Sequence, residues 1–315
     1  MTDNPSSDKK FILYGLKPEE YEHPLDRQAL NALEGTPGLE TIIRKINQYG
    51  IEKIYRAQHT GSNIRVTSTN IPEVYRIFLD VCQTINLKTL PELYIQQGED
   101  INAFAIGSEN PIVVLNQGTV RKYTDKELAW IIGHEIGHIK SQHTVYRMLA
   151  EQIFPYLGDI LGKVTLGIGE LFSTPILIAL KNWSRKSELT CDRAGLLAVQ
   201  DFDVAVTALM KMAGAPETHY AKLDPQQFLT QARSFEAFDE DNLDKIAKLI
   251  SVMDSTHPWT VMRCAELDSW CQSGSYKQMI ETHCNQVVTS AFCKHCGKSA
   301  KSGATFCIHC GNSIK

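Results

Sequence analysis

The residues best suited to chemistry lie close together in the stretch Trp130–His138, WIIGHEIGH. His134 and His138 are four residues apart, so on a helix both imidazoles project from one face and can bind the same metal ion. Zinc with three protein ligands keeps a position open for water, whose pKa it lowers to about 7. Glu135 stands beside the histidines, where a carboxylate can take a proton from that water and pass it to a leaving amine.

A helix must hold these residues, and a capping box marks its start. Thr124 and Glu127 have the Thr-x-x-Glu spacing in which each side chain bonds to the backbone N–H of the other residue. The helix is expected to continue at least through His143. Gly133 and Gly137 each cost about 1 kcal/mol relative to alanine inside a helix, which indicates that another backbone approaches closely. A helix with two ordinary histidines would not account for this context.

The third metal ligand has to come from elsewhere in the chain. A metzincin would need glycine and histidine at the positions that hold Ser141 and Thr144, so that class of metallopeptidase is excluded. His143 lies one residue out of that register. His143 is at least as well interpreted as an ordinary polar residue of the helix as a residue with a role near the metal.

A better candidate is Glu188, in the sequence SELTCDRAG. Glu188, Asp192 and Gly195 share one face of a second helix, expected to begin near Ser184 or Ser187. Glu188 would complete a set of two histidines and one glutamate. Asp192, one turn later, is placed to accept the free ring N–H of a zinc-bound histidine and fix its tautomer. Taken alone, an acidic pair at this spacing is most often a solvated helix face.

The combination of HEIGH with the later ELTCD resembles the gluzincin metallopeptidases of the HtpX-like and CAAX prenyl protease family, metallopeptidase family forty-eight. NAFA, HPLD and HPWTVMR, which begin at Asn102, His23 and His257, strengthen the likeness. It spans most of residues 20–272. It implies an α+β fold, a mainly helical gluzincin metallopeptidase domain with a small β-sheet, in which Glu188 completes the zinc site.

The resemblance also implies roles outside the metal ligands. The strand that holds Asn102, Ala103, Phe104 and Ala105 would lie beside the cleft and pair with an extended peptide. His257 and Arg263 would lie near the metal, where a cation or an N–H donor could stabilise an oxyanion. For these last two the alternative is structural, with His257-Pro258 starting a helix and Arg263 pairing with an acidic neighbour. The strand itself is predicted from β-branched runs at 102–107 and 111–116, which indicate a hairpin.

The C-terminus repeats itself, since AFCKHCGKSA is echoed by TFCIHCGNSI. Two CxxC pairs result, Cys293 with Cys296 and Cys307 with Cys310, which is the ligand pattern of a four-thiolate structural zinc site. The segment resembles a zinc ribbon, and metal binding would supply its folding energy. A protein partner could bind here. Nucleic acid is possible but not favoured, because few lysines lie nearby.

Composition and segmentation complete the prediction. We expect a disordered N-terminus at 1–10, a metallopeptidase domain at 11–272, a linker at 273–290 and the ribbon at 291–315. A net charge of -4 gives no sign of a duplex nucleic-acid binder. The N-terminus lacks the features of a secretory signal, which favours the cytoplasm and reduced cysteines.

One apolar segment, 153–180, needs separate treatment because membrane relatives could place spanning helices there. Asp159, Lys163 and Glu170 interrupt it, so we expect a helical hairpin that covers the cleft, with peripheral membrane contact as the lesser alternative. The predicted function is a zinc-dependent metalloendopeptidase that cleaves extended or unfolded polypeptides, with one catalytic and one structural Zn²⁺. The alternative is a catalytically silent adaptor that binds a partner through the ribbon, and the presence of Glu135 argues against it.

Overall fold

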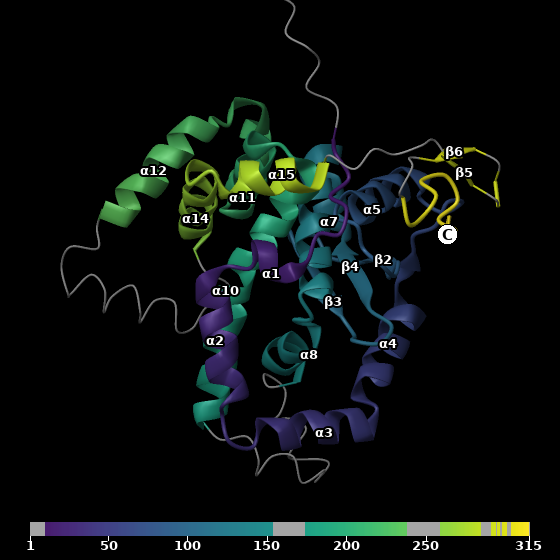
Figure 1. Ribbon diagram of the computed structural model, residues 1–315, viewed down its shortest axis with the longest axis vertical. Helices are drawn as coiled ribbons and strands as arrows, with labels where there is room; N and C mark the ends of the chain where they lie inside the picture. Colours follow the sequence, from purple (N-terminus) through teal and green to yellow (C-terminus); the bar gives the residue numbers. More distant parts are fainter. Residues whose placement is uncertain are drawn as a thin grey trace, which may run out of the picture.

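The computed structural model describes residues 10–153, 174–237, 259–284, 291–293, 295–296, 298–300 and 304–314. In these residues the chain is mainly helical, with a four-stranded sheet and a small C-terminal module (Figure 1). This confirms the α+β fold class expected from the sequence. No helix in this part of the chain is both long and apolar enough to cross a membrane.

The N-terminal part of the chain is a series of helices. They are α1 (Pro18–Tyr21), α2 (Pro24–Glu34), α3 (Leu39–Tyr49), α4 (Ile51–Ser62) and, after the first strand, α5 (Pro72–Thr84). Three of them begin with proline, whose fixed φ and missing N–H suit the first helical position. His23 caps α2, since its Nδ1 accepts a hydrogen bond from the Leu25 backbone N–H at 3.1 Å.

The sheet has the strand order β1-β2-β4-β3. Its strands are β1 (Ile64–Arg65), β2 (Glu92–Gln96), β3 (Ala103–Ile106) and β4 (Ile112–Asn116). β3 pairs antiparallel with β4, with Phe104 opposite Val114, which confirms the predicted hairpin. β2 pairs parallel with β4. β3 therefore lies at one end of the sheet.

Both faces of β4 are buried, and they contribute to two different core clusters. Val113 and Leu115 belong to the larger cluster with the Trp130 side chain, whereas Ile112 and Val114 belong to a second cluster with residues of α2 and α3. A strand covered on both faces reads as a continuous apolar run. The sequence IVVLN has that character.

Helix α7 (Asp125–Lys140) follows the short α6 (Gln117–Lys122) and lies between the sheet and α10 (Figure 1). The predicted capping box is present, with the Thr124 backbone N–H donating to Glu127 at 2.8 Å. The prediction that this helix continues at least through His143 is wrong, because Gln142 adopts a left-handed backbone with φ 59° and turns the chain. α8 (Thr144–Arg147) and the π-helix η1 (Met148–Ile153) follow.

Helix α10 (Thr174–Val199) begins earlier than Ser184 or Ser187, where the sequence analysis placed its start. The early turns are helical because Ile176, Leu180 and Trp183 recur at helical spacing and are fully buried. Of the segment expected to form a covering hairpin, 154–173 lies outside the described residues. Of its remainder, Ile153 ends η1, and residues 174–180 belong to α10.

The helices after α10 are α11 (Phe202–Met212), the 3₁₀-helix η4 (Glu217–Lys222), α12 (Pro225–Ala237), α14 (Thr260–Gln272) and α15 (Ser275–Cys284). α15 occupies most of the stretch expected to be a linker. Its His283 explains why it is ordered against the domain, since Nδ1 lies 2.6 Å from the Tyr14 carbonyl oxygen and Nε2 lies 3.1 Å from Glu20. Residues 285–290 lie outside the described part, and the division into domains stays a prediction.

The C-terminal module contains β5 (Ala291–Phe292) paired antiparallel with β6 (Ser299–Ala300). It contacts α5, where the Gln83 side-chain amide donates to the Phe306 carbonyl at 3.4 Å. Gly311, with φ 73°, faces Tyr75 so closely that a Cβ would overlap the tyrosine hydroxyl. The module therefore packs on the helical domain.

Candidate metal centre

The two histidines and Glu188 lie on the facing helices α7 and α10, which glycine brings into close contact. A Cβ at Gly133 would lie 2.6 Å from the Ala198 Cβ, and a Cβ at Gly137 would lie 2.7 Å from the Ala194 Cβ. Ordinary carbon contacts are about 3.5–4.0 Å, so only glycine fits at either position. The predicted close backbone approach is confirmed, and the partner is the helix that carries Glu188.

The three side chains expected to bind metal come together with suitable spacing. His134 Nε2 and His138 Nε2 are 3.3 Å apart, and the two oxygens of Glu188 lie 3.4 Å from His134 Nε2 and 3.3 Å from His138 Nε2. Tetrahedral zinc with bonds of about 2.0–2.1 Å has ligand atoms about 3.3–3.4 Å apart. All three residues are buried. The donor set and its spacing therefore fit a zinc ion.

Glu135 lies beside this cluster at the wall of a cavity of about 320 Å³. Its side chain is buried, and its Oε2 has no hydrogen-bond partner in the described part of the chain. A buried carboxylate oxygen without a partner is costly unless water, an ion or a substrate reaches it. His134, Arg263 and Ala103 also line the cavity.

Asp192 connects His134 to a buried arginine. Its Oδ1 lies 3.0 Å from His134 Nδ1, so the ring nitrogen that faces away from Glu188 has an acceptor. Arg263 holds the same carboxylate with hydrogen bonds of 2.8 and 2.6 Å. Arg263 thus lies at the cluster and is paired with an acidic neighbour, as the structural alternative expected. His257 lies outside the described residues.

Arg147 is a cation at this cluster that the sequence analysis did not identify. Its guanidinium donates to Glu188 Oε1 at 2.5 Å, contacts His138 Nε2, and donates to Glu151 at 2.9 Å. Glu188 Oε1 and His138 Nε2 are also atoms that would bind a metal ion, so a metal ion and this guanidinium compete for them. The sequence offered one weak signal, the helical spacing of Arg147 and Glu151.

These charges set the pKa values in the cluster. Burial alone would lower the pKa of His134, but the carboxylates of Glu188 and Asp192 outweigh it and raise this pKa to about 9. Burial and the Arg147 guanidinium hold the pKa of His138 well below its ordinary value. Burial raises the pKa of Glu135. Because metal ligands must give up their protons, metal binding is expected to displace a proton from His134.

The strand expected to receive substrate lies next to this cluster. Asn102 and Ala103 line the cavity together with His134 and Glu135. Because β3 is the end strand of the sheet, no other strand in the described part of the chain pairs with its outer edge. Phe104 instead points to α4, with its ring 5.2 Å from that of His59. Ala105 is buried.

The four C-terminal cysteines form a second cluster. The sulfurs of Cys293 and Cys310 are 3.6 Å apart, and those of Cys296 and Cys307 are 3.5 Å apart. Four thiolates around zinc, with bonds of about 2.3 Å, have sulfurs about 3.8 Å apart. All four sulfurs lie within 4.8 Å of one another. The predicted structural site is therefore geometrically suited to zinc.

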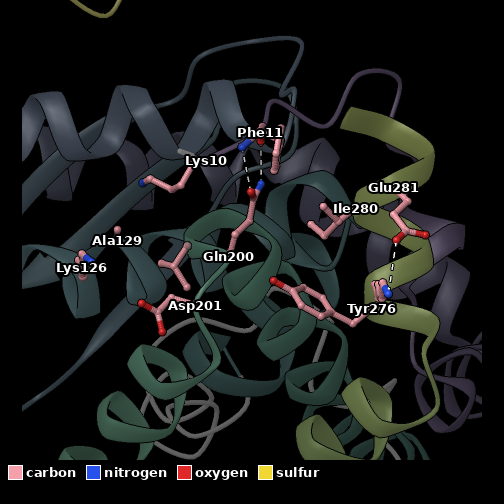
Figure 2. Close-up of a pocket in the computed structure, with 11 residues that line it drawn as sticks. Lys10, Phe11, Lys126, Ala129, Gln200, Asp201, Tyr276, Ile280 and Glu281 are labelled. Carbon is pink, nitrogen blue, oxygen red and sulfur yellow. Dashed lines mark hydrogen bonds and ion pairs between the residues drawn. The ribbon is translucent and has the colours of Figure 1, made fainter. Parts of the chain in front are cut away.

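Another cavity, of about 330 Å³, lies between the N-terminal segment, the end of α10 and α15 (Figure 2). The Gln200 side-chain amide accepts from the Phe11 backbone N–H at 2.8 Å and donates to its carbonyl at 2.7 Å. Tyr276 and Ile280 line the opposite wall. None of the residues that line this cavity belongs to the His-His-Glu cluster or to the four-cysteine cluster.

The helical fold and the buried His-His-Glu cluster place the chain among the metallopeptidases. A model of Peptidase family M48 matches residues 68–271, and the chain belongs to this family.

The chain also aligns with named proteins and with one solved structure. The chain is 29% identical to Plastoglobule-localized metallopeptidase 48, chloroplastic, of Arabidopsis thaliana over 86% of this chain and 78% of that protein. It is 35% identical to a Protease HtpX homolog of Streptococcus gordonii over 30% of this chain and 33% of that protein. The crystal structure of S. mikatae Ste24p aligns with a TM-score of 0.39 at 16% identity, covering 77% of this chain and 64% of that chain.

Proposed function

We propose that the protein is a zinc-dependent endopeptidase that cleaves extended or unfolded polypeptides. The observation that supports this most is the clustering of His134, His138 and Glu188 beside Glu135. The two histidine Nε2 atoms are 3.3 Å apart, and each lies 3.3–3.4 Å from one oxygen of Glu188. Glu135 Oε2 has no hydrogen-bond partner in the described part of the chain. A zinc ion bound there would lower the pKa of a water molecule and polarise the substrate carbonyl. His134, His138 and Glu188 would hold it, and Asp192 would keep His134 in the required tautomer.

Glu135 is the proton carrier in this proposal. Its carboxylate takes a proton from the attacking water and delivers it to the nitrogen of the cleaved amide. Burial raises the pKa of Glu135, which makes the carboxylate a stronger base than an exposed glutamate. Arg263 lines the same cavity and would stabilise negative charge on the substrate oxygen, while its pairing with Asp192 holds it in place. The expected contribution of His257 remains a prediction.

The outer edge of β3 would bind the substrate main chain. A peptide that adds as a further strand gains hydrogen bonds from the backbone and few from side chains, so extended polypeptides of varied sequence would fit. The position of Asn102 and Ala103 on the same cavity as Glu135 supports this arrangement. The substrate must be locally unfolded, because only an extended backbone can pair with a strand.

The experiment compares the full-length protein with its Glu135→Gln variant on an unstructured polypeptide. The wild-type protein should cleave it, stop after zinc is removed by a chelator and recover when zinc is restored. Glu135→Gln should keep its zinc and lose hydrolysis by several orders of magnitude, because the variant lacks only the base. Zinc-loaded wild-type protein without activity would favour the adaptor alternative, in which the ribbon binds a protein partner.

Location remains a separate prediction. The sequence favours the cytoplasm with peripheral membrane contact through 153–180 as an alternative, and one relative is named as plastoglobule-localized. Fractionation of cells with and without carbonate would distinguish these locations. Association of the protein with membranes that resists carbonate would contradict both the cytoplasmic location and the peripheral contact.

A further inference from the structure

The two histidines proposed to bind zinc differ in the group that faces Nδ1 of each ring. His134 Nδ1 faces the carboxylate of Asp192, whereas His138 Nδ1 faces the ring of His143, with the two Nδ1 atoms 3.3 Å apart. We propose that His143 is a positioning residue that accepts the N–H of His138 and fixes the ring for metal binding. This inference rests on the proposed zinc site and assigns a residue whose role the sequence left open.

The hydrogen-bonding capacity of the neighbours supports this direction. When Nε2 binds a metal ion, a neutral His138 carries its proton on Nδ1 and needs an acceptor there. Arg147 Nη1 is also 3.3 Å from His138 Nδ1, but a guanidinium has no acceptor. His143 can supply a lone pair on Nδ1 if its own proton is on Nε2. Of these two neighbours, His143 is therefore the acceptor.

Asp26 favours that tautomer of His143. Its Oδ2 lies 3.4 Å from His143 Nε2, and no closer partner for this nitrogen occurs in the described part of the chain. The distance is long for a hydrogen bond, so the carboxylate acts mainly by attracting the N–H. Thr190 of α10 donates to the same oxygen at 2.5 Å and fixes it. Both His143 and Asp26 are fully buried.

The backbone at the end of α7 brings His143 to this place. The left-handed Gln142, with φ 59°, reverses the chain, and the His143 backbone N–H then donates to the His138 carbonyl at 2.9 Å. A left-handed glutamine is uncommon, and such strained positions gather at functional sites. A helix continued through residue 143 would point this side chain elsewhere, since positions five apart do not share a helix face.

Cys191 offers a competing explanation. Its sulfur lies 3.7 Å from His143 Nδ1, and with His138 the three residues could form a separate metal site. However, His138 would then have to bind two ions through its two nitrogens. Burial raises the pKa of the Cys191 thiol well above its ordinary value, whereas a metal ligand would be the thiolate.

The test measures zinc affinity of the full-length protein by competition with a chelator. Glu188→Ala identifies which phase of zinc release belongs to the His-His-Glu site. His143→Leu should weaken that phase by about 10–100-fold, because it removes the acceptor behind a metal ligand. His143→Asn, whose Oδ1 replaces the Nδ1 acceptor, should stay within about threefold of the wild type. Zinc at the four cysteines should be unchanged in both.

His283→Leu is the matched control, because it removes another buried histidine that has two partners but lies outside the cluster. It should lower thermal stability and leave zinc affinity unchanged. His143→Gln, whose amide reaches the Nε2 position, should bind zinc as weakly as His143→Leu. If His143→Leu does not fold, the zinc affinities of His143→Asn and His143→Gln are compared instead, and the inference requires tighter binding by His143→Asn.

Three results would overturn the inference. One is unchanged zinc affinity in His143→Leu, another is equal affinity in His143→Asn and His143→Gln, and the third is a further zinc equivalent that Cys191→Ala removes. Failure of the wild-type protein to bind zinc at His134, His138 and Glu188 is a different result. It would refute the proposed function itself.

Discussion

Substitution of Gly137 by alanine tests whether close helix packing sets the metal geometry. Gly137 precedes the ligand His138 and faces α10, and the added methyl group would lie 2.7 Å from the Ala194 Cβ and 3.3 Å from the Cys191 Cα. The contact with Ala194 is about 1 Å shorter than an ordinary carbon contact. Neither neighbour is the end of a flexible side chain, so the two helices must separate.

Two effects of opposite sign determine the stability of Gly137→Ala. Overpacking typically costs about 1–3 kcal/mol. Alanine returns up to about 1 kcal/mol of helix propensity. The free energy of unfolding should therefore fall by about 0–2 kcal/mol instead of rising. Separation of the helices by a large part of 1 Å also lengthens the 3.3 Å distance from His138 to Glu188, so zinc affinity should fall on the order of tenfold or more.

Gly61→Ala is the matched control. Gly61 lies in α4, and a Cβ there would meet nothing within 4 Å, so only the propensity effect operates. This variant should gain about 0.5–1 kcal/mol and bind zinc as the wild type does. Denaturant unfolding measures both stabilities, and chelator competition measures both affinities. A Gly137→Ala protein as stable as Gly61→Ala, with unchanged zinc affinity, would refute the reasoning.

Three further variants test other parts of the structure. Glu188→Ala should lose zinc from the His-His-Glu site and hydrolysis together, and elemental analysis showing two zinc equivalents would contradict this ligand assignment. Cys307→Ser should remove only the C-terminal zinc, leaving one equivalent and a zinc-dependent activity. Lys140→Met should stabilise the protein at pH 7, because burial lowers the pKa of Lys140 to about 8 and the native state disfavours its charge. The gain should be about 1–2 kcal/mol after allowance for solvent. It should shrink as the pH rises through the folded pKa and disappear only above about pH 11, where the unfolded lysine is also neutral. Equal gains at pH 7 and pH 11 would exclude this cause.

The sequence predicted those features that depend on residue type at a fixed spacing. The Thr124 capping box, the glycine contacts of α7 and the β3–β4 hairpin follow from local patterns, and all are present. The clustering of His134, His138 and Glu188 also agrees with expectation. The histidine spacing is a property of one helix. Finding Glu188 required the resemblance to a family in addition to its shared face with Asp192.

Other features depend on tertiary contacts and carried little sequence signal. Gln142 is not a residue type that marks a left-handed turn, so neither the end of α7 nor the position of His143 could be read from it. Helix α15, within the stretch 273–290, was not expected from the sequence because it depends on contacts such as that of His283 with Tyr14, nearly the whole chain away. Arg147 reaches Glu188 only because α8 folds back toward α10.

The position of β3 also has a consequence for how the protein behaves in solution. Within the residues that the structure describes, no strand pairs with the outer edge of β3, and such an edge can pair with any exposed β-edge, including that of another copy or of an aggregating protein. The strand is only four residues long, which keeps the backbone surface available for such pairing small. A site that accepts unfolded chains through its backbone therefore carries an inherent risk of self-association, and the shortness of β3 limits that risk.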